Sequence, residues 1–345
     1  MKRSLALASV LLVLVPLAAG CGGGGGQKAA PATTSANGKT IKVGLVTDVG
    51  GLNDRGFNHL AYVGVKEAQA KLGIQYNVSL SASSSEYVPN LTSLARKGYD
   101  LVIGVGFTEA EAIDTAAHLF RHTKFAIVDV DQTTEPHKPP NLLGLLFREQ
   151  EVGYLAGYLA GLEVKRMPGK DVVGSVGGQK QPPVDRFIAG YQAGAKAADP
   201  GVETLNGYSN DFTKQDLCKA VALNQIGEGA QVVFQVAGGC GLGVIAAARE
   251  KNVWAIGVDA DQAYIDPKHV LTSATKHVDV AVYKAIESVV KGTFKGGNVV
   301  YGLKDNGVGL GKINSSVPQN EVTAVKKIDA DVVSGKVKNI PTLVK

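Results

Sequence analysis

Polar side chains gather directly after an apolar segment near the front of the chain, in the run IKVGLVTDVGGLNDRGFN. The apolar part ends at Asp48, and the residues that follow include Asn53, Asp54, Phe57 and Asn58. Carboxylates and amides form hydrogen bonds, and a phenylalanine ring offers a flat apolar face. A strand followed by such a loop belongs at the carboxyl edge of a parallel sheet, where open α/β proteins bind small molecules. The run therefore predicts part of a site for a polar ligand that contains a ring.

One short motif occurs in both halves of the chain, as VDVDQ with Asp129 and as VDADQ with Asp259. Each of these carboxylates, like Lys276, follows an apolar segment. A carboxylate at a strand end accepts hydrogen bonds from a vicinal diol or an amide edge, and its alternative role is to cap the following helix. Phe57 and Phe234 provide two flat faces that could enclose a ring, although either one alone is more typical of a core.

The elements that position these residues alternate along the chain. Strands that alternate with helices of about 10–15 residues form parallel sheets with right-handed crossovers. The predicted strands are 42–48, 77–81, 101–105, 125–130, 142–147, 171–176, 203–208, 232–236, 254–258 and 271–274. The predicted helices are 57–72, 88–97, 109–120, 152–164, 186–198, 213–228, 242–251, 278–291 and 319–334. Two sets of similar length predict an α/β fold with two doubly wound lobes.

The last part of the chain is expected to contribute to both lobes. We expect the first lobe to comprise residues 39–150 and about 275–297, and the second to comprise about 151–274 and 298–345. Several crossings of the chain between two lobes form a hinge, and hinged lobes close on ligands held between them.

The first residues have the pattern of an export signal. Lys2 and Arg3 precede an apolar segment over 5–17, which is shorter than the roughly 20 apolar residues of a membrane span. Small residues that end in Gly-Cys resemble a bacterial lipoprotein signal, with residues 1–20 as the signal peptide and Cys21 as the lipidated residue. The alternative is an ordinary cleaved signal with a chance cysteine. Residues 21–38, rich in Gly, Ala, Pro, Ser and Thr, are expected to form a flexible tether.

The body of the chain contains two further cysteines, Cys218 and Cys240. Cysteines of exported proteins pair more often than they stay free, and a helix that contains Cys218 could meet the glycine-rich loop that contains Cys240. We therefore expect a structural disulfide, with two free thiols as the alternative. The pair lacks CxxC spacing, which argues against a redox role.

Composition and motifs exclude several function classes. With 45% apolar and 19% charged residues the chain is typical of a soluble globular protein, and its net charge of +5 comes without a basic cluster, so no nucleic-acid partner is expected. The glycine clusters lack the spacing of dinucleotide- or phosphate-binding loops, so no cofactor is expected. No nucleophile elbow or acid–base pair is present, and His118 and His122 lack a third ligand, which argues against catalysis and against a metal site.

Several segments together resemble the basic membrane protein family of ABC-transporter substrate-binding lipoproteins, which includes the bacterial purine-nucleoside receptor. The segments are DVGGLNDRGFN, FAIVDVDQ, FREQEVGYLAG, DRFIAGYQAG, VVFQVAGGCGLGV, IGVDADQ and TSATKHVDVAVY, between Ile41 and about Lys291. Two positions depart from the family pattern. Gly56 stands where the family usually has serine, and Cys240 lies within the glycine-rich loop.

The resemblance implies a type I periplasmic-binding fold with two Rossmann-like lobes and a ligand-enclosing cleft. It implies that Phe57 and Phe234 stack on a base, that Asp129 contacts the base edge, and that Asp259 holds ribose hydroxyls. The other ligand contacts that it implies are Asn53, Asp54, Asn58, Gly239 and Lys276. The expected function is that of the extracytoplasmic receptor of an ABC importer for a purine nucleoside, which is no enzyme. Its expected partners are a permease, an ATPase and, through a lipid anchor, the outer face of the cell membrane or a periplasmic membrane surface.

Three other functions stay open at this point. The ligand could be another small polar molecule, such as a sugar or a signalling furanose, because carbohydrates also stack on aromatic rings. The protein could instead be an exported sensor or surface adhesin that signals through a partner. The third alternative is an exported enzyme that acts on nucleosides.

Overall fold

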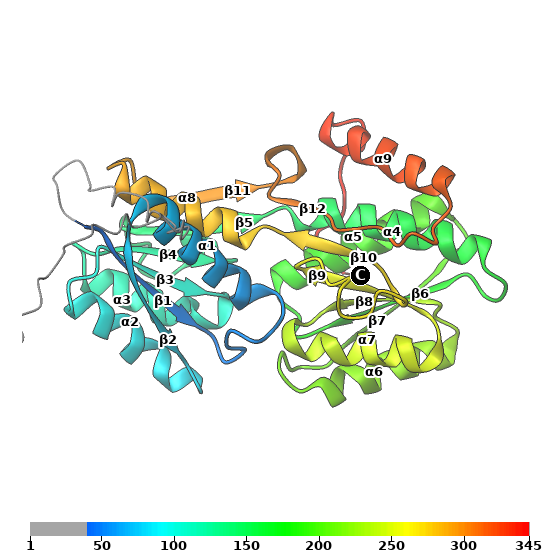
Figure 1. The fold of residues 1–345 in the computed structure, drawn as a ribbon, viewed down its shortest axis with the longest axis horizontal. Helices are drawn as coiled ribbons and strands as arrows, with labels where there is room; N and C mark the ends of the chain where they lie inside the picture. Colours follow the sequence, from blue (N-terminus) through cyan, green and yellow to red (C-terminus); the bar gives the residue numbers. More distant parts are fainter. Residues whose placement is uncertain (1–39, 345) are drawn as a thin grey trace, which may run out of the picture.

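The computed structural model describes residues 40–344, which fold around two separate six-stranded sheets (Figure 1). The first sheet has the strand order β11-β5-β4-β3-β1-β2, and all neighbouring strands in it run parallel. Its strands are β1 (Lys42–Thr47), β2 (Gln75–Leu80), β3 (Leu101–Val105), β4 (Lys124–Val128), β5 (Leu142–Phe147) and β11 (Gly297–Tyr301). With its helices, this sheet forms the first lobe.

The second sheet repeats this topology, with the order β12-β10-β9-β8-β6-β7. Only β12 among its described strands runs antiparallel to its neighbour, β10. The strands are β6 (Val172–Gly177), β7 (Glu203–Tyr208), β8 (Val232–Val236), β9 (Trp254–Asp259), β10 (Val270–Lys276) and β12 (Val308–Leu310). The ten strands predicted from the alternating pattern are confirmed within one or two residues, and the α/β class with them.

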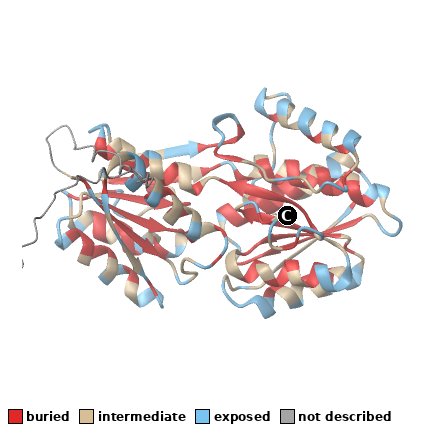
Figure 2. Ribbon diagram, viewed as in Figure 1, coloured by how far each residue is buried: buried red, intermediate tan, exposed pale blue. Residues whose placement is uncertain are grey.

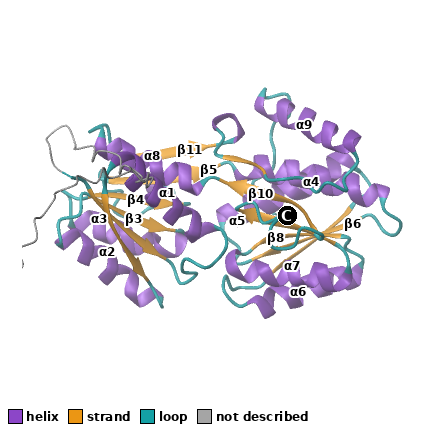
Figure 3. Ribbon diagram, in the orientation of Figure 1, coloured by secondary structure: helices purple, strands orange, loops and turns teal. Residues whose placement is uncertain are grey.

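Helices cover both faces of each sheet (Figure 3). In the first lobe α1 packs against α8 and α2 against α3, and in the second lobe α4 packs against α5 and α6 against α7. Their bounds are α1 (Phe57–Leu72), α2 (Tyr87–Arg96), α3 (Ala110–Leu119), α4 (Glu149–Arg166), α5 (Pro182–Ala198), α6 (Gln215–Glu228), α7 (Leu242–Lys251), α8 (Val278–Val290) and α9 (Gln319–Val333). The strands are therefore largely buried, while the outer helix faces are exposed (Figure 2). This explains why β3 and β8 are continuous apolar runs rather than alternating ones.

The helices α4 and α5 approach each other unusually closely because glycines lie at their contact. A Cβ atom at Gly157 of α4 would overlap the carbonyl oxygen of Tyr191, and one at Gly194 of α5 would overlap that of Tyr154. The glycine-spaced helix that the sequence predicted is thus a packing feature. It places the start of α5, and with it Phe187, against the start of α4.

The chain passes between the two lobes after β5, after β10 and after β11. The sequence placed the last of these crossings at about residue 298, but β11 pairs with β5 as far as Tyr301, so the crossing follows this strand. β11 is an edge strand with exposed Val299 and Val300, so its burial pattern does not reveal which sheet it joins. Within residues 40–344 we find no helix with the length and apolar character that a membrane crossing requires.

Candidate functional site

A cleft opens between the lobes at the carboxyl ends of the parallel strands. It contains about 610 Å³ of empty space, part of which is open to solvent. The polar side chains on its wall are those of Asp48, Asp54, Asn58, Asp129, Asp259 and Lys276. Seven of the nine predicted ligand-binding residues line the cleft: Asp54, Phe57, Asn58, Asp129, Gly239, Asp259 and Lys276. Asn53 and Phe234 do not.

The aromatic wall consists of Phe57, Phe107, Phe187 and Phe212. Phe57 begins α1, Phe107 begins the short 3₁₀ helix η2 (Phe107–Glu109) after β3, and Phe212 lies in the loop after β7. The rings of Phe107 and Phe212 make an edge-to-face contact across the cleft, with centroids 5.7 Å apart. Such a pair stabilises the closed arrangement by about 1 kcal/mol, in addition to the free energy gained by burying the two rings.

Phe234 occupies a different place from the one that the sequence suggested. It is the central residue of β8, is fully buried, and packs on Tyr191 and Phe187 with centroids 5.1 and 6.0 Å away. The ring therefore fills the core between the sheet and α5. The residue of this strand that reaches the cleft is Val236, at its carboxyl end.

The first loop is organised by two carboxylates. Asp54 accepts hydrogen bonds from the backbone N–H groups of Asn58 (2.7 Å) and His59 (3.1 Å), so it caps the first turn of α1. Asp48 accepts from the Asn58 side-chain amide at 2.7 Å and from the N–H of Gly50 at 2.8 Å. Burial raises the pKa of both carboxyl groups above the ordinary value, and the hydrogen bonds that they accept offset only part of this increase. Asn53 is exposed in the preceding turn.

The two VDxDQ motifs place Asp129 and Asp259 in matching positions. Each follows or ends a buried strand, β4 and β9, and each has a left-handed backbone with φ of 66° and 62°. This conformation is uncommon for residues other than glycine, asparagine and aspartate. In both lobes it places the carboxylate at the cleft wall instead of continuing the strand.

Lys276 connects the two lobes at the bottom of the cleft. It ends β10 of the second sheet, and its ammonium donates to Asp129 Oδ2 of the first lobe at 2.6 Å. Glu149 Oε1 lies 3.6 Å and Asp259 Oδ1 3.8 Å from the same nitrogen, and Arg186 Nε donates to Glu149 Oε2 at 2.6 Å. The Lys276 ammonium also lies 4.8 Å from the centroid of the Phe57 ring, which favours a cation–π contact.

Burial and the surrounding charges shift the titration of this cluster. Burial raises the pKa of Asp259 to about 7; Lys276 lowers it, and the negative charges of Asp129, Asp54 and Glu149 raise it further. Burial alone would lower the pKa of Lys276, but Asp129, Asp259 and Glu149 outweigh this and hold it above its ordinary value. Asp129 Oδ1 and Asp259 Oδ1 are buried without a hydrogen-bond partner among the described residues. Both oxygens are therefore acceptors without a donor at the cleft wall.

Gly239 belongs to the 3₁₀ helix η4 (Gly238–Gly241), which follows β8. A Cβ atom there would lie 3.7 Å from Asp54 Cα of the first lobe, so this is a point of close approach between the lobes. Immediately behind it, the predicted pairing of Cys218 with Cys240 is confirmed, with the two Cα atoms 5.6 Å apart. The predicted lipidation site, Cys21, lies outside the described residues.

Sequence reasoning missed Phe107, Phe187 and Phe212. A signal for Phe212 existed, because the Asn-Asp-Phe sequence after β7 resembles the Asn-Asp-x-x-Phe sequence after β1. Phe107 likewise follows the end of β3 by two residues. Phe187 had no such signal, because it lies within a helix whose position at the cleft depends on packing.

No described group of three or more His, Cys, Asp or Glu side chains between residues 40 and 344 is arranged to hold a metal ion. His118, one of the two histidines weighed for such a role, stacks on the ring of His137 with centroids 4.3 Å apart.

Two α/β lobes linked by several crossings, with a cleft at the carboxyl ends of both sheets, define the type I periplasmic-binding fold. Residues 41–340 match the family model described as ABC transporter substrate-binding protein, PnrA-like. An uncharacterized lipoprotein of Pyrococcus horikoshii is 36% identical over 95% of this chain and 85% of its own length. A protein of Lactococcus lactis subsp. cremoris named ABC transporter nucleoside-binding protein BmpA is 34% identical over 97% of this chain and 98% of its own length.

A solved structure of an ABC transporter solute-binding protein from Aeropyrum pernix is also similar. It has a TM-score of 0.79 and 29% identity, and the match covers 87% of this chain and 94% of that one. The chain belongs to the basic membrane protein family of ABC-transporter substrate-binding proteins. Such proteins act outside the cytoplasm as the binding components of transporters and are not enzymes.

Proposed function

We propose that this protein binds purine nucleosides in the cleft and delivers them to an ABC importer. The observation that carries the proposal is a pair of buried oxygens without a described hydrogen-bond partner, Asp129 Oδ1 and Asp259 Oδ1, beside a wall of phenylalanine rings. Buried acceptors are costly unless a donor reaches them. A ligand that supplies hydroxyl or N–H donors together with a flat ring satisfies both features. The relative BmpA, named nucleoside-binding, supports this choice of ligand.

The charge of the cleft narrows the ligand class further. Asp129, Asp259 and the neighbouring Glu149 outnumber the two cations that contact this cluster, the buried Lys276 and the half-buried Arg186, which pairs with Glu149. A phosphate brought into this cluster would meet carboxylates at short range in a low-dielectric environment. We therefore infer that the ligand is a nucleoside without phosphate. Its ribose diol would bind Asp259, its base edge would bind Asp129, and its base would lie against Phe57 and Phe212.

The remaining predicted contacts have smaller roles in this proposal. Asn58 has a buried side-chain oxygen without a described partner, so it would accept a hydrogen bond from the ligand. Gly239 has no side chain, so the ligand would approach its backbone closely. Asp54, which caps α1, would act mainly by fixing Phe57.

Contacts across the cleft explain how binding would be coupled to closure. Lys276 reaches Asp129, Phe107 contacts Phe212, and Gln262 Nε2 donates to the carbonyl oxygen of Arg55 at 3.3 Å. All three contacts join one lobe to the other, so opening the cleft must break them. A ligand that bridges the lobes would add to these contacts and shift the population toward the closed state, which the permease would recognise.

The experiment is calorimetric titration of the protein with inosine, adenosine, guanosine, the free bases, ribose and the matching monophosphates. We expect binding of at least one purine nucleoside and much weaker binding of the bases, of ribose and of the monophosphates. A sugar that binds tightly while every nucleoside fails would overturn the proposal and favour a carbohydrate receptor. Conversion of nucleoside to free base during the titration would point to an exported enzyme.

We further propose that Cys21 is lipidated and holds the protein at the outer face of a membrane. The named lipoprotein relative supports this role. In cells, the wild-type protein should fractionate with membranes and a Cys21→Ser variant should not. Equal membrane association of both would contradict the anchor.

A further inference from the structure

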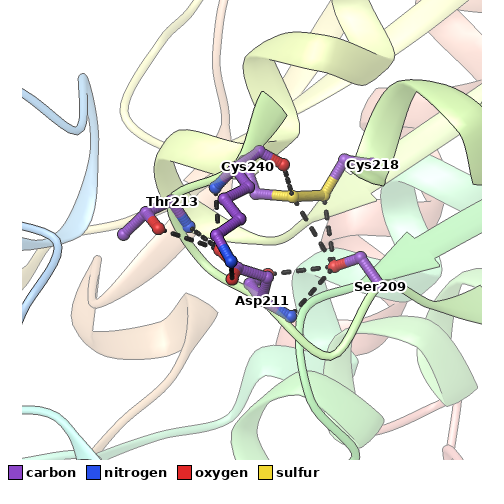
Figure 4. Close-up of polar contacts among 6 residues, drawn as sticks. Ser209, Asp211, Thr213, Cys218 and Cys240 are labelled. Carbon is purple, nitrogen blue, oxygen red and sulfur yellow. Dashed lines mark hydrogen bonds and ion pairs between the residues drawn. A yellow bond between two sulfur atoms is a disulfide. The ribbon is translucent and has the colours of Figure 1, made fainter. Parts of the chain in front are cut away.

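The Cys218–Cys240 disulfide (Figure 4) is adjacent in the chain to Gly239, which lines the cleft wall of the second lobe. Cys240 follows Gly238 and Gly239, which line the cleft, within η4. Cys218 lies in the first turns of α6, on the other side of the bond. Both cysteines are fully buried, so the bond belongs to the interior of the lobe. It joins a segment of the wall to the helix that supports it.

The same disulfide contacts the loop that contains Phe212. The backbone N–H of Cys240 donates to the carbonyl oxygen of Phe212 at 2.9 Å. Cys240 Sγ lies 2.9 Å from the carbonyl oxygen of Lys214, and the Ser209 hydroxyl lies 3.3 Å from Cys218 Sγ. The disulfide therefore connects η4 with residues 209–214.

Hydrogen bonds within the loop add to this connection. Asp211 Oδ1 accepts from the backbone N–H groups of Thr213 and Lys214, both at 2.7 Å. The Ser209 hydroxyl donates to the carbonyl oxygen of Asp211 at 2.9 Å and lies in contact with the sulfur atoms of the disulfide (Figure 4). Phe212 is thus held between a hydrogen-bonded turn and a covalent bond.

The first lobe has a weaker connection at the matching position. There η2, which contains Phe107 and Thr108, is joined to α2 by a hydrogen bond from the Tyr87 hydroxyl to Thr108 Oγ1 at 3.5 Å. The two phenylalanines that meet across the cleft are therefore supported differently, by a long hydrogen bond on one side and by a disulfide on the other.

We propose that the Cys218–Cys240 disulfide is a positioning element of the binding site, which holds the Phe212 ring and the backbone of Gly238 and Gly239 in the arrangement that encloses the ligand. The inference deepens the proposed function, since it requires a ligand that contacts this wall. A wall that is already ordered before binding loses less conformational entropy when the ligand arrives. The disulfide thus contributes to affinity in addition to the stability that any such crosslink provides.

The test is the Cys218→Ala/Cys240→Ala double variant, titrated with the nucleoside that the wild-type protein binds best. We expect roughly tenfold weaker binding, the effect of poorly placing one stacking ring, and mainly through faster dissociation. Phe212→Ala should weaken binding less in the double variant than in the wild-type background, because the ring is already poorly placed there. Full additivity of the two effects, or an unchanged affinity in the folded double variant, would overturn the proposal.

Val172→Ala is the matched control. Val172 belongs to the same buried apolar cluster as the two cysteines, but it begins β6 at the end of the sheet away from the cleft. We expect this variant to melt at a lower temperature and to bind with wild-type affinity. An equal loss of affinity in Val172→Ala would show that stability alone determines binding, and would overturn the positioning role.

Hydrogen exchange in the ligand-free protein tests the same inference without any nucleoside. The backbone amide at position 240, which donates to the carbonyl oxygen of Phe212, should exchange about tenfold faster in the double variant and at the wild-type rate in Val172→Ala. Should the double variant not fold, Ser209→Ala keeps the disulfide and removes the hydroxyl that links it to the loop. Faster exchange at Cys240 and Thr213 is expected there, and unchanged exchange at both would count against the proposal. Absence of nucleoside binding by the wild-type protein would refute the proposed function and leave this measurement valid.

Discussion

The two VDxDQ motifs share a sequence, a position at a strand end and a left-handed aspartate, yet their carboxylates have different surroundings. Asp129 in the first lobe accepts a hydrogen bond from Lys276 at 2.6 Å. Asp259 in the second lobe lies 3.8 Å from the same ammonium, and its buried Oδ1 has no described hydrogen-bond partner. Lys276 belongs to the second sheet, so the cation of one lobe neutralises the carboxylate of the other.

This difference gives Asp129 and Asp259 different roles, although their sequence motifs are equivalent. Asp129 contributes to the contact between the lobes and keeps one oxygen for a ligand. Asp259 has no close hydrogen bond from Lys276, so its carboxylate is available to a ligand. Burial raises the pKa of this carboxyl group to about 7. The comparison predicts that Asp129 matters for both stability and binding, whereas Asp259 matters for binding and reduces stability.

Lys276→Met is expected to have the largest effect, because it leaves Asp129, Asp259 and Glu149 without the cation that they share. Removing one partner of a buried ion pair typically costs about 3–5 kcal/mol of stability. Thermal and urea unfolding at pH 7 measure the loss. A variant that unfolds like the wild-type protein would contradict the cluster as described.

The rescue of this variant distinguishes the two aspartates. Adding Asp129→Asn to Lys276→Met should restore more stability than adding Asp259→Asn, because Asp129 loses the closer partner. Equal rescue by the two substitutions would remove the asymmetry on which the comparison rests.

Asp259→Asn should weaken nucleoside binding by roughly a hundredfold, since hydrogen bonds to a charged group contribute about 1.5–3 kcal/mol each. The melting temperature at pH 7 should stay the same or rise. The folded-state pKa lies above the ordinary value of 3.8, so ionising Asp259 lowers stability as the pH rises from about 4 to about 7. Calorimetry and thermal unfolding of the same sample give both quantities.

Asp261→Asn is the matched control for this variant. Asp261 lies in the same motif, but it accepts backbone hydrogen bonds from Ala263 and Lys312 near the surface and does not line the cleft. The Asp261→Asn variant should bind the nucleoside with the same affinity as the wild-type protein. A loss in Asp261→Asn as large as that in Asp259→Asn would mean that the loop, and not the carboxylate, determines binding.

Nucleoside affinity should rise about tenfold between pH 6 and pH 8, because the ligand diol binds the ionised carboxylate of Asp259, whose pKa is about 7. The gain should be nearly complete at pH 8. Titrations at several pH values test this, and Asp259→Asn should show little of the change. A flat profile in the wild-type protein would mean that Asp259 does not accept the ligand's hydrogen bonds in its ionised form.

The sequence predicted the sheets well because their signal is local. Strands such as β3 and β8 are continuous apolar runs, and parallel strands need helices between them. It also predicted Asp129, Asp259 and Lys276 as strand-end groups at the cleft. It could not predict which aspartate Lys276 contacts, because that distance depends on how the lobes sit against each other.

Phe234 and Phe212 show the same limit for the aromatic wall. Both lie near the carboxyl end of a strand in the sequence, but only Phe212 lies beyond the end of its strand and reaches the cleft. Phe234 lies two residues before the end of β8, where its side chain enters the core, while Phe212 lies beyond the end of β7. The direction in which a side chain points depends on sheet packing, which composition and spacing do not reveal.

Gly56→Ser should have the smallest effect, and it tests whether a hydrogen-bond donor added beside Asp259 changes the titration of this carboxylate. A Cβ atom at Gly56 would lie 3.6 Å from Asp259 Cβ and 3.7 Å from its Oδ2, so a serine hydroxyl there could donate to the carboxylate. Such a bond should lower the pKa of Asp259 by about one unit, equivalent to about 1.4 kcal/mol, and shift the midpoint of the affinity profile below pH 7. Gly56→Ala adds the same Cβ without the hydroxyl, so the difference between the two variants isolates the hydrogen bond. Identical pH profiles for the serine and alanine variants would show that residue 56 does not control the pKa of Asp259.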